Sequence, residues 1–346
     1  MKIIKHLAFI IIVVSLFSCN RKEKAITVLS FGGTFAEAQK EAYYRPFEEE
    51  TGITVQEANY NGEYGKIEAA IKTNDIPWNV IDVESAALMR GIENGLFEKL
   101  DYSIIDTTDI INAVINDYAV GTDIYSLSLG YSKAFDKLDS QPNSWKDFWD
   151  VEKYPGFRTL KKDPKFNFEI ALMADGVPIE HIYDGDTLDI ERAFRKLDEI
   201  KPYIKVWWTT GQQPIQLLAD GEVVMAGAFG ARLWTAEHLD NRPLALTWNQ
   251  SIADVDYWAV PKGAKDKELA MKFINSSLQP EKQVNFSKIF PLGPTNKRAF
   301  EYIDDSVAKE LNTYPENFQK HIILNTKYWQ KNEEKIIDRW NEWLLK

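Results

Sequence analysis

The sequence predicts an α/β protein with two lobes, each built on a mainly parallel sheet with flanking helices. From Ala25 onward, short apolar runs alternate with amphipathic segments, a pattern typical of parallel sheets covered on both faces. The alternation occurs in two stretches with extended segments between them, which indicates two lobes. The length of 346 residues is also too great for one ordinary core.

The first stretch contains three expected strands, each followed by a helix. The first helix should begin at Thr34, because Thr34 and Glu37 have the spacing of a capping box. Pro46 should break or restart it and Gly52 should cap its end, while Ser85 is the expected N-cap of the third helix. The strands are expected at 26–29, 53–58 and 80–83, and the second and third helices at 64–72 and 85–95.

The middle of the chain repeats the pattern, and the part after residue 270 reads as mostly helical. Strands are expected at 124–129, 203–208 and 223–226, and helices at 144–149, 168–174, 188–200 and 211–219. In such folds, ligands bind where strand carboxyl ends meet helix N-termini. The loops at 30–34 and 84–85 are therefore expected at a site.

The N-terminus has the pattern of a signal peptide. Lys2 and Lys5 precede an apolar run over 7–17, which is too short to span a bilayer as a helix. The run ends in Leu16-Phe17-Ser18-Cys19, which resembles the bacterial lipobox, where cleavage precedes the cysteine and its thiol is lipidated. Residues 1–18 are thus interpreted as a signal peptide, Cys19 as the lipidated residue, and 19–24 as a tether. This predicts an exported lipoprotein facing the periplasm or cell surface; a buried structural cysteine is the alternative.

Composition argues against several functions. Residues 1–18 contain two lysines and no acids, so their removal changes the formal net charge from −11 to −13, which disfavours nucleic acid as a partner. No zinc spacing, phosphate loop or nucleophile elbow appears, so we expect no cofactor, no metal and no enzyme activity. A surface glycosidase, using paired acids and some of the eleven tryptophans, is a remote alternative. A structural or adhesive lipoprotein is another.

Several segments, taken in order, carry a resemblance to a known family. They are Ser30-Phe31-Gly32-Gly33-Thr34, Glu50-Thr51-Gly52-Ile53-Thr54-Val55, Glu93-Asn94-Gly95-Leu96, Ala219-Asp220-Gly221-Glu222-Val223 and Asp254-Val255-Asp256-Tyr257-Trp258-Ala259-Val260-Pro261-Lys262-Gly263. Together they resemble the extracellular solute-binding proteins of the spermidine/putrescine type, which serve ABC importers.

The resemblance spans nearly the whole mature chain and implies a type II periplasmic-binding-protein fold. In that fold, two lobes joined by a two-strand hinge close on the ligand, which shifts the population toward the closed state. Lobe one would comprise 25–126 and 256–300, and lobe two 127–255 and 301–346. The implied function is that of a monomeric receptor that captures a polyamine and delivers it to ABC permease subunits in the inner membrane.

The family pattern also implies ligand-binding residues. Asp256 would hold an ammonium group through a charge-assisted hydrogen bond, Asp163 would supply a second acid, and Phe229 would stack on the ligand. Phe166 stands where polyamine binders place a further acid, and Glu84 is the candidate that replaces its charge. Packing of Phe229 in a core, and backbone capping by Asp256, are the alternative interpretations.

Arg232 departs from the pattern, because some putrescine binders carry an acid at that position. An arginine there could pair with Asp256 or Asp163, or bind a carboxylate of the ligand. The alternative prediction is therefore a receptor of the same fold that binds a zwitterionic amino compound or another small solute. Trp208 is a candidate stacking surface, and the candidate set is completed at helix N-termini by Thr34, Phe35 and Ser85.

Overall fold

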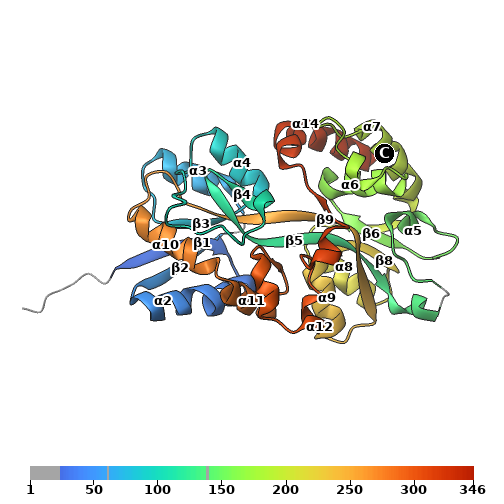
Figure 1. Cartoon of the computed structure of the whole chain (residues 1–346). Coiled ribbons are helices and arrows are strands. Elements are labelled where there is room, and N and C mark those ends of the chain that lie inside the picture. The colour runs from blue at the N-terminus through green and yellow to red at the C-terminus, as the bar shows by residue number, and fades with distance from the viewer. Residues whose placement is uncertain (1–23, 61, 138–139) are drawn as a thin grey trace, which may run out of the picture.

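Two lobes lie side by side, and two long strands run from one to the other (Figure 1). The computed structural model describes residues 24–60, 62–137 and 140–346, so Cys19 and the predicted signal peptide lie outside the described residues. The long strands are β5 (Ala119–Ser132) and β9 (Leu244–Ala259), which pair antiparallel along most of their length. The predicted α/β class with two lobes is confirmed.

Within the described residues, the strands form one continuous sheet in the order β2-β1-β3-β9-β5-β8-β6-β7. Lobe one contributes β1 (Ala25–Phe31), β2 (Thr54–Tyr60) and β3 (Val80–Glu84), and lobe two contributes β6 (Arg158–Lys161), β7 (Ile204–Trp208) and β8 (Met225–Phe229). Each trio is parallel internally. The two hinge strands run antiparallel to their neighbours β3 and β8, so the sheet as a whole is mixed. Relative movement of the lobes must therefore be absorbed by β5 and β9.

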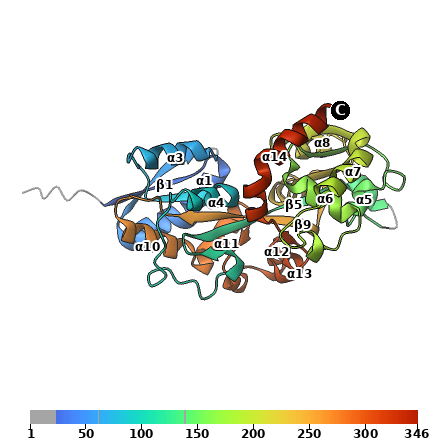
Figure 2. The same cartoon turned by 90° about the horizontal axis from the view of Figure 1, so that it is seen from above.

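Helices cover both faces of the sheet in each lobe (Figures 1 and 2). In lobe one they are α1 (Thr34–Gln39), α2 (Arg45–Thr51), α3 (Tyr64–Lys72), α4 (Ser85–Glu93), α10 (Lys267–Ser277) and α11 (Pro280–Ile289). In lobe two they are α5 (Trp145–Trp149), α6 (Pro164–Ala174), α7 (Ile190–Ile200), α8 (Gln213–Ala219), α9 (Gly230–His238) and α14 (Thr326–Leu345).

The smaller elements connect these helices and strands. Short strands β4 (Ile115–Asn116) and β10 (Gly293–Pro294) pair with β5, and β11 (Ile322–Ile323) pairs with β9. The short helices are α12 (Asp305–Ala308), α13 (Pro315–Phe318), η2 (Asn112–Val114), η3 (Lys133–Lys137), η4 (Ile179–His181), η5 (Lys201–Tyr203) and η6 (Lys297–Glu301). In the part of the chain that the structure describes, no helix combines the length and apolar character needed to cross a bilayer.

Two predicted helix caps are wrong. Thr34 and Ser85 are the first helical residues rather than the N-caps, which are Gly33 and Glu84, and neither cap makes a side-chain hydrogen bond. The hydroxyl of Ser85 instead donates to Asp254 Oδ1 at 2.5 Å. Ser85 thus takes a tertiary partner on β9, which a local sequence window does not show.

A new helical element begins beside Pro46, which is one of the two outcomes expected there. A π-helical segment, η1 (Lys40–Tyr44), joins α1 to α2, and Pro46 lies in the first turn of α2, where its missing N–H costs no hydrogen bond. The predicted cap at Gly52 is confirmed, since this residue is left-handed with φ 67°. The helix at 64–72 and the capping of α5 by Ser144 are also as predicted.

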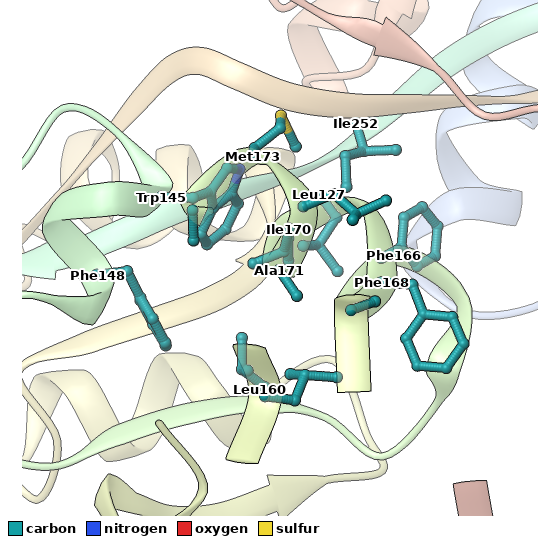
Figure 3. Packing of buried hydrophobic residues seen from close by; sticks show 14 of the residues in the cluster. Leu127, Trp145, Phe148, Leu160, Phe166, Phe168, Ile170, Ala171, Met173 and Ile252 are labelled. Atoms are coloured by element: carbon teal, nitrogen blue, oxygen red, sulfur yellow. The ribbon is translucent and has the colours of Figure 1, made fainter. Parts of the chain in front are cut away.

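The core of lobe two is aromatic. Figure 3 shows Trp145 and Phe148 of α5 gathered with Leu160 of β6 and with Phe168 and Ile170 of α6. The C-terminal helix α14 adds three buried tryptophans to this cluster, at positions 329, 340 and 343. Each large side chain removed from water contributes about 1.5–3 kcal/mol, so α14 is an integral part of lobe two.

Helix α14 also reaches lobe one. Its N-terminal half packs against α4, where Gln330 Nε2 donates to Glu93 and Arg90 lies 4.0 Å from Glu333. These contacts lie on one side of the hinge strands (Figure 2). The assignment of 25–126 with 256–300 to lobe one and the rest to lobe two places two of its three crossings inside β5 and β9 and the third within η6, and we retain it as a proposal.

Candidate ligand-binding site

A cavity of about 270 Å³ is lined by residues from both lobes and from the hinge. Lobe one contributes the loop after β1 and the end of β3, and lobe two contributes the turn after β6 and the junction of β8 with α9. Tyr125 and Ser126 of β5 line it from the hinge. The expected loops 30–34 and 84–85 both reach the cavity, through Phe31, Gly32, Thr34 and Glu84.

Two carboxylates line the cavity from lobe one. Glu84 ends β3 and lies directly opposite Asp256 of β9. Burial raises the pKa of Asp256 well above its usual range, and the neighbouring acids Asp123 and Asp82 raise it further. Desolvation in the cleft raises the pKa of Glu84 as well, although Lys165 opposes this shift. The lobe-one wall is therefore acidic, and a ligand cation would favour the ionised form of both carboxyl groups.

The lobe-two wall is basic. Lys161 lies 3.0 Å from Asp163, so its charge is already balanced. Lys165 is 7 % exposed; burial lowers its pKa, but Asp254, Glu84 and other nearby acids outweigh that effect and raise it overall.

Arg232 differs from both lysines. The residue is exposed, and partial desolvation lowers its pKa. Among the described residues its guanidinium makes only one long hydrogen bond, from Nη1 to Gln212 Oε1 at 3.5 Å. No acid of the described residues forms an ion pair with it. The planar guanidinium is therefore available to a carboxylate group, which it can bind through two parallel hydrogen bonds.

Aromatic rings form much of the remaining wall. Phe229 packs edge-on against Tyr125 and Trp208, with ring centroids 6.0 Å and 5.6 Å away. Phe166 has φ +76°, a conformation uncommon for a bulky residue. This turn brings both Lys165 and Phe166 to the cavity wall, and strained backbone of this kind is concentrated at functional sites.

The cavity brings together six of the nine predicted ligand-binding residues, namely Thr34, Phe35, Glu84, Phe229, Arg232 and Asp256. The other three do not line it. Ser85 is bonded to Asp254, Asp163 accepts from the backbone N–H of Lys165 and pairs with Lys161, and Trp208 is buried with its Nε1 donating to Gly227 O at 2.8 Å. These three do not line the cavity, and their assignment as direct ligand contacts stays a prediction.

Several lining residues were absent from the predicted set. The lysines at 161 and 165 lie around β6, a four-residue strand too short to stand out in the sequence. Tyr125 and Ser126 lie in a segment predicted as a strand, and alternation along that strand could have marked them. Phe290 and Leu292 follow α11, and no local signal distinguishes them from core residues.

Comparison with protein families and curated proteins is consistent with this geometry. Residues 42–319 match a family model described as bacterial extracellular solute-binding protein. The chain is 38% identical over 329 residues to a gamma-aminobutyric acid-binding protein of Pseudomonas aeruginosa PAO1, covering 94% of this chain and 92% of that protein. It is 25% identical over 285 residues to the spermidine/putrescine-binding periplasmic protein of Escherichia coli K12, covering 78% of each.

Solved structures show a similarity to the same class of protein. A structure described as a GABA receptor superposes with a TM-score of 0.83 at 34% sequence identity, covering 93% of this chain and 98% of that one. The similarity thus extends over both lobes and the hinge, and includes every segment that lines the cavity.

Proposed function

The chain belongs to the bacterial extracellular solute-binding proteins that serve ABC transporters, and on that premise we propose that its ligand is a small zwitterionic amino compound, with γ-aminobutyric acid as first candidate. Proteins of this family bind solutes and are not enzymes. The observation that carries the proposal is the charge pattern of the cavity. Arg232, whose guanidinium has no acidic partner within the described part of the chain, lines the same cavity as Asp256 and Glu84.

A zwitterion complements both the acidic wall and the basic wall of the cavity. Its carboxylate would bind Arg232 on lobe two, and its ammonium group would bind Asp256 and Glu84 on lobe one. Such a ligand contacts both lobes only when the cleft is closed, so it stabilises the closed state. The aromatic rings, including Phe229, would pack against the methylene groups between the two charges.

A polyamine, the ligand that the family resemblance implies, fits this charge pattern less well than a zwitterion does. A polyamine carries positive charge at both ends, so one end would face Arg232 and Lys165, and like charges in a desolvated cleft repel strongly. The comparisons also favour a zwitterion, since the polyamine-binding relative is less similar to this chain than the gamma-aminobutyric acid-binding one. The zwitterionic alternative is therefore the better supported reading.

Thermal unfolding in the presence of single ligands tests the proposal. A ligand that binds only the folded protein stabilises it by about 2.7 kcal/mol at a concentration of 100 times Kd. We expect γ-aminobutyric acid and its five-carbon homologue to raise the midpoint, and putrescine and spermidine to leave it unchanged. Arg232→Met should abolish the response, whereas Arg298→Met, a matched change at an exposed pair with Glu301, should retain it. A response to polyamines alone would contradict the proposal and support a polyamine as the ligand.

Membership of this family implies export, and we propose that Cys19 anchors the exported protein in a membrane. The support is the lipobox pattern and the absence of any other cysteine. The Cys19→Ala variant is expected to appear in the soluble fraction of cells, while the unaltered protein sediments with membranes and incorporates radiolabelled fatty acid. Equal sedimentation of both forms would contradict lipid anchoring. Ligand binding should be the same in both, since the described fold begins after this residue.

A further inference from the structure

Behind the lobe-one wall of the cavity lies a row of acidic residues, Asp82 on β3, Asp123 on β5 and Asp256 on β9. The three strands are adjacent in the sheet, with β9 in the centre. Asp256 lies directly opposite Asp123 on one side and Glu84 on the other. Like charges directly opposite each other in a sheet destabilise it, so this arrangement needs a compensating feature.

Hydrogen bonds compensate only one member of the row. Asp82 Oδ2 accepts from Gln39 Nε2 at 2.6 Å and from Ser30 Oγ at 3.2 Å. Both carboxyl oxygens of Asp123 lack a partner among the described residues, as do Asp82 Oδ1 and Asp256 Oδ1. Asp123 is 1 % exposed, and an unpaired buried carboxylate carries a large desolvation penalty.

Cations do not compensate the row either. Among the described residues, no lysine, arginine or histidine forms an ion pair with any of the three acids, and no group of acidic, histidine or cysteine side chains is arranged to hold a metal ion. The cationic side chains nearest the cavity belong to lobe two, where Lys165 acts on Glu84 and Lys161 is paired with Asp163. Arg232 lines the opposite wall.

The other titratable groups around the row are acids and phenols. Glu84 and Asp254 act on Asp256, and both raise its pKa. The phenols that interact with the row belong to Tyr43, Tyr44, Tyr60, Tyr125 and Tyr257. Burial raises the pKa of each of these phenols, so they stay neutral at physiological pH and supply no charge that could balance the row.

Protons are the remaining means of neutralising the row. Burial raises the pKa of Asp82 to about 7 and those of Asp123 and Asp256 well above the usual range, with mutual repulsion adding to the effect. Because the three groups interact, they titrate together, and a bound proton cannot be assigned to one residue. Asp256 is the member that reaches the cavity, so it connects the row to solvent and to the ligand.

We propose that the row of Asp82, Asp123 and Asp256 holds protons when the cavity is empty, and that an ammonium group arriving at Asp256 displaces one of them to solvent. This inference rests on the proposed function in that the ligand carries an ammonium group. The exchange balances, because the carboxyl group of Asp256 loses a proton and the resulting carboxylate pairs with the cation of the ligand. Binding is then linked to pH, and affinity increases by up to about tenfold per pH unit while Asp256 is protonated in the free protein.

Calorimetry with γ-aminobutyric acid measures the released proton. Titrations at pH 6.5 in phosphate and in imidazole, which differ in ionisation enthalpy, should give different heats, corresponding to release of up to one proton per ligand bound. Asp123→Asn removes one acid from the row and with it part of the repulsion on Asp256, so a smaller share of Asp256 should be protonated before binding. We expect this variant to release less proton and to show a flatter dependence of affinity on pH. Equal heats in the two buffers for the unaltered protein would overturn the proposal.

A ligand-free measurement separates this proposal from the identity of the ligand. A carboxyl group whose pKa is higher in the folded than in the unfolded state stabilises the fold below the unfolded pKa, and this stability is lost as pH rises through the folded pKa. The unaltered protein should therefore lose more stability between pH 5 and pH 8 than Asp123→Asn, whose melting midpoint at pH 8 should be higher by about 2 °C or more.

The Asp117→Asn variant is the matched control, since Asp117 is an exposed residue paired with Lys99; it should follow the unaltered protein. If Asp123→Asn lowers the midpoint equally at both pH values, Asp123 is a stabilised anion and the proposal is wrong. If the melting behaviour is as expected but no variant binds γ-aminobutyric acid, the ligand assignment fails and the protonated row stands.

Discussion

The Arg158→Met variant is expected to lose about 3–5 kcal/mol of unfolding free energy, because each buried carbonyl left unpaired costs about 1–3 kcal/mol. Arg158 is fully buried at the start of β6. Its guanidinium donates to Phe148 O at 3.1 Å, Asp150 O at 3.2 Å and Tyr154 O at 2.5 Å, and also to Gly156 O. Burial lowers its pKa to about 10, so it stays charged at neutral pH.

These hydrogen bonds tie the segment after α5 to β6, and β6 leads to Lys161 and Lys165 on the cavity wall. Urea unfolding followed by tryptophan fluorescence would measure the loss. Arg158→Lys keeps the charge but supplies fewer donors in a different geometry, and should give an intermediate loss. Arg192→Met, which removes a partly exposed ion pair with Asp175, should cost no more than about 1 kcal/mol. Equal stability of Arg158→Met and the unaltered protein would show that the loop relaxes without penalty.

The second large effect is on binding. Asp256→Asn is expected to weaken γ-aminobutyric acid binding by about 1.5–3 kcal/mol at pH 8, the usual contribution of a hydrogen bond to a charged group. The effect should be smaller at pH 6, because the unaltered protein must first release a proton from Asp256 there. Titration calorimetry at the two pH values measures both quantities.

The fold of Asp256→Asn should be intact, since an amide in place of a buried carboxyl removes repulsion from Asp123. Its melting midpoint in the absence of ligand is therefore expected to equal or exceed that of the unaltered protein. Asp117→Asn again supplies the matched control and should bind with unchanged affinity. Unchanged affinity in Asp256→Asn would remove this residue from the ammonium site.

The alternation of strands and helices could be predicted because it is encoded locally. The helix at Tyr64–Lys72 agrees to the residue, and the ends of most other elements differ by a few positions. The strand expected at 124–129 is the fourteen-residue β5, and no bounds were predicted for the sixteen-residue β9. The length of both strands comes from their pairing along each other across both lobes. Such tertiary pairing leaves little trace in a short sequence window.

The site was only partly predictable for the same reason. Asp256 and Arg232 were identified through their places in a family pattern, and both line the cavity. Asp82 and Asp123 were not predicted as part of the site. Each is a single acid between uncharged residues in the sequence, and only the register of the sheet shows that they lie near Asp256. The interaction joins positions far apart in the chain, and only the register of three strands brings them together.

The place of β9 in the sheet has a consequence for biosynthesis. It separates β3 from β5, so neither lobe can complete its sheet before residue 259 has left the ribosome, and the core of lobe two waits further for the tryptophans of α14. Domains usually fold as they are synthesised, starting from the N-terminus, but here the central strand β9 and the helix α14 postpone that step until residues 326–345 have also been made. A chain that must cross a membrane in extended form benefits from this delay, because premature folding would block its passage.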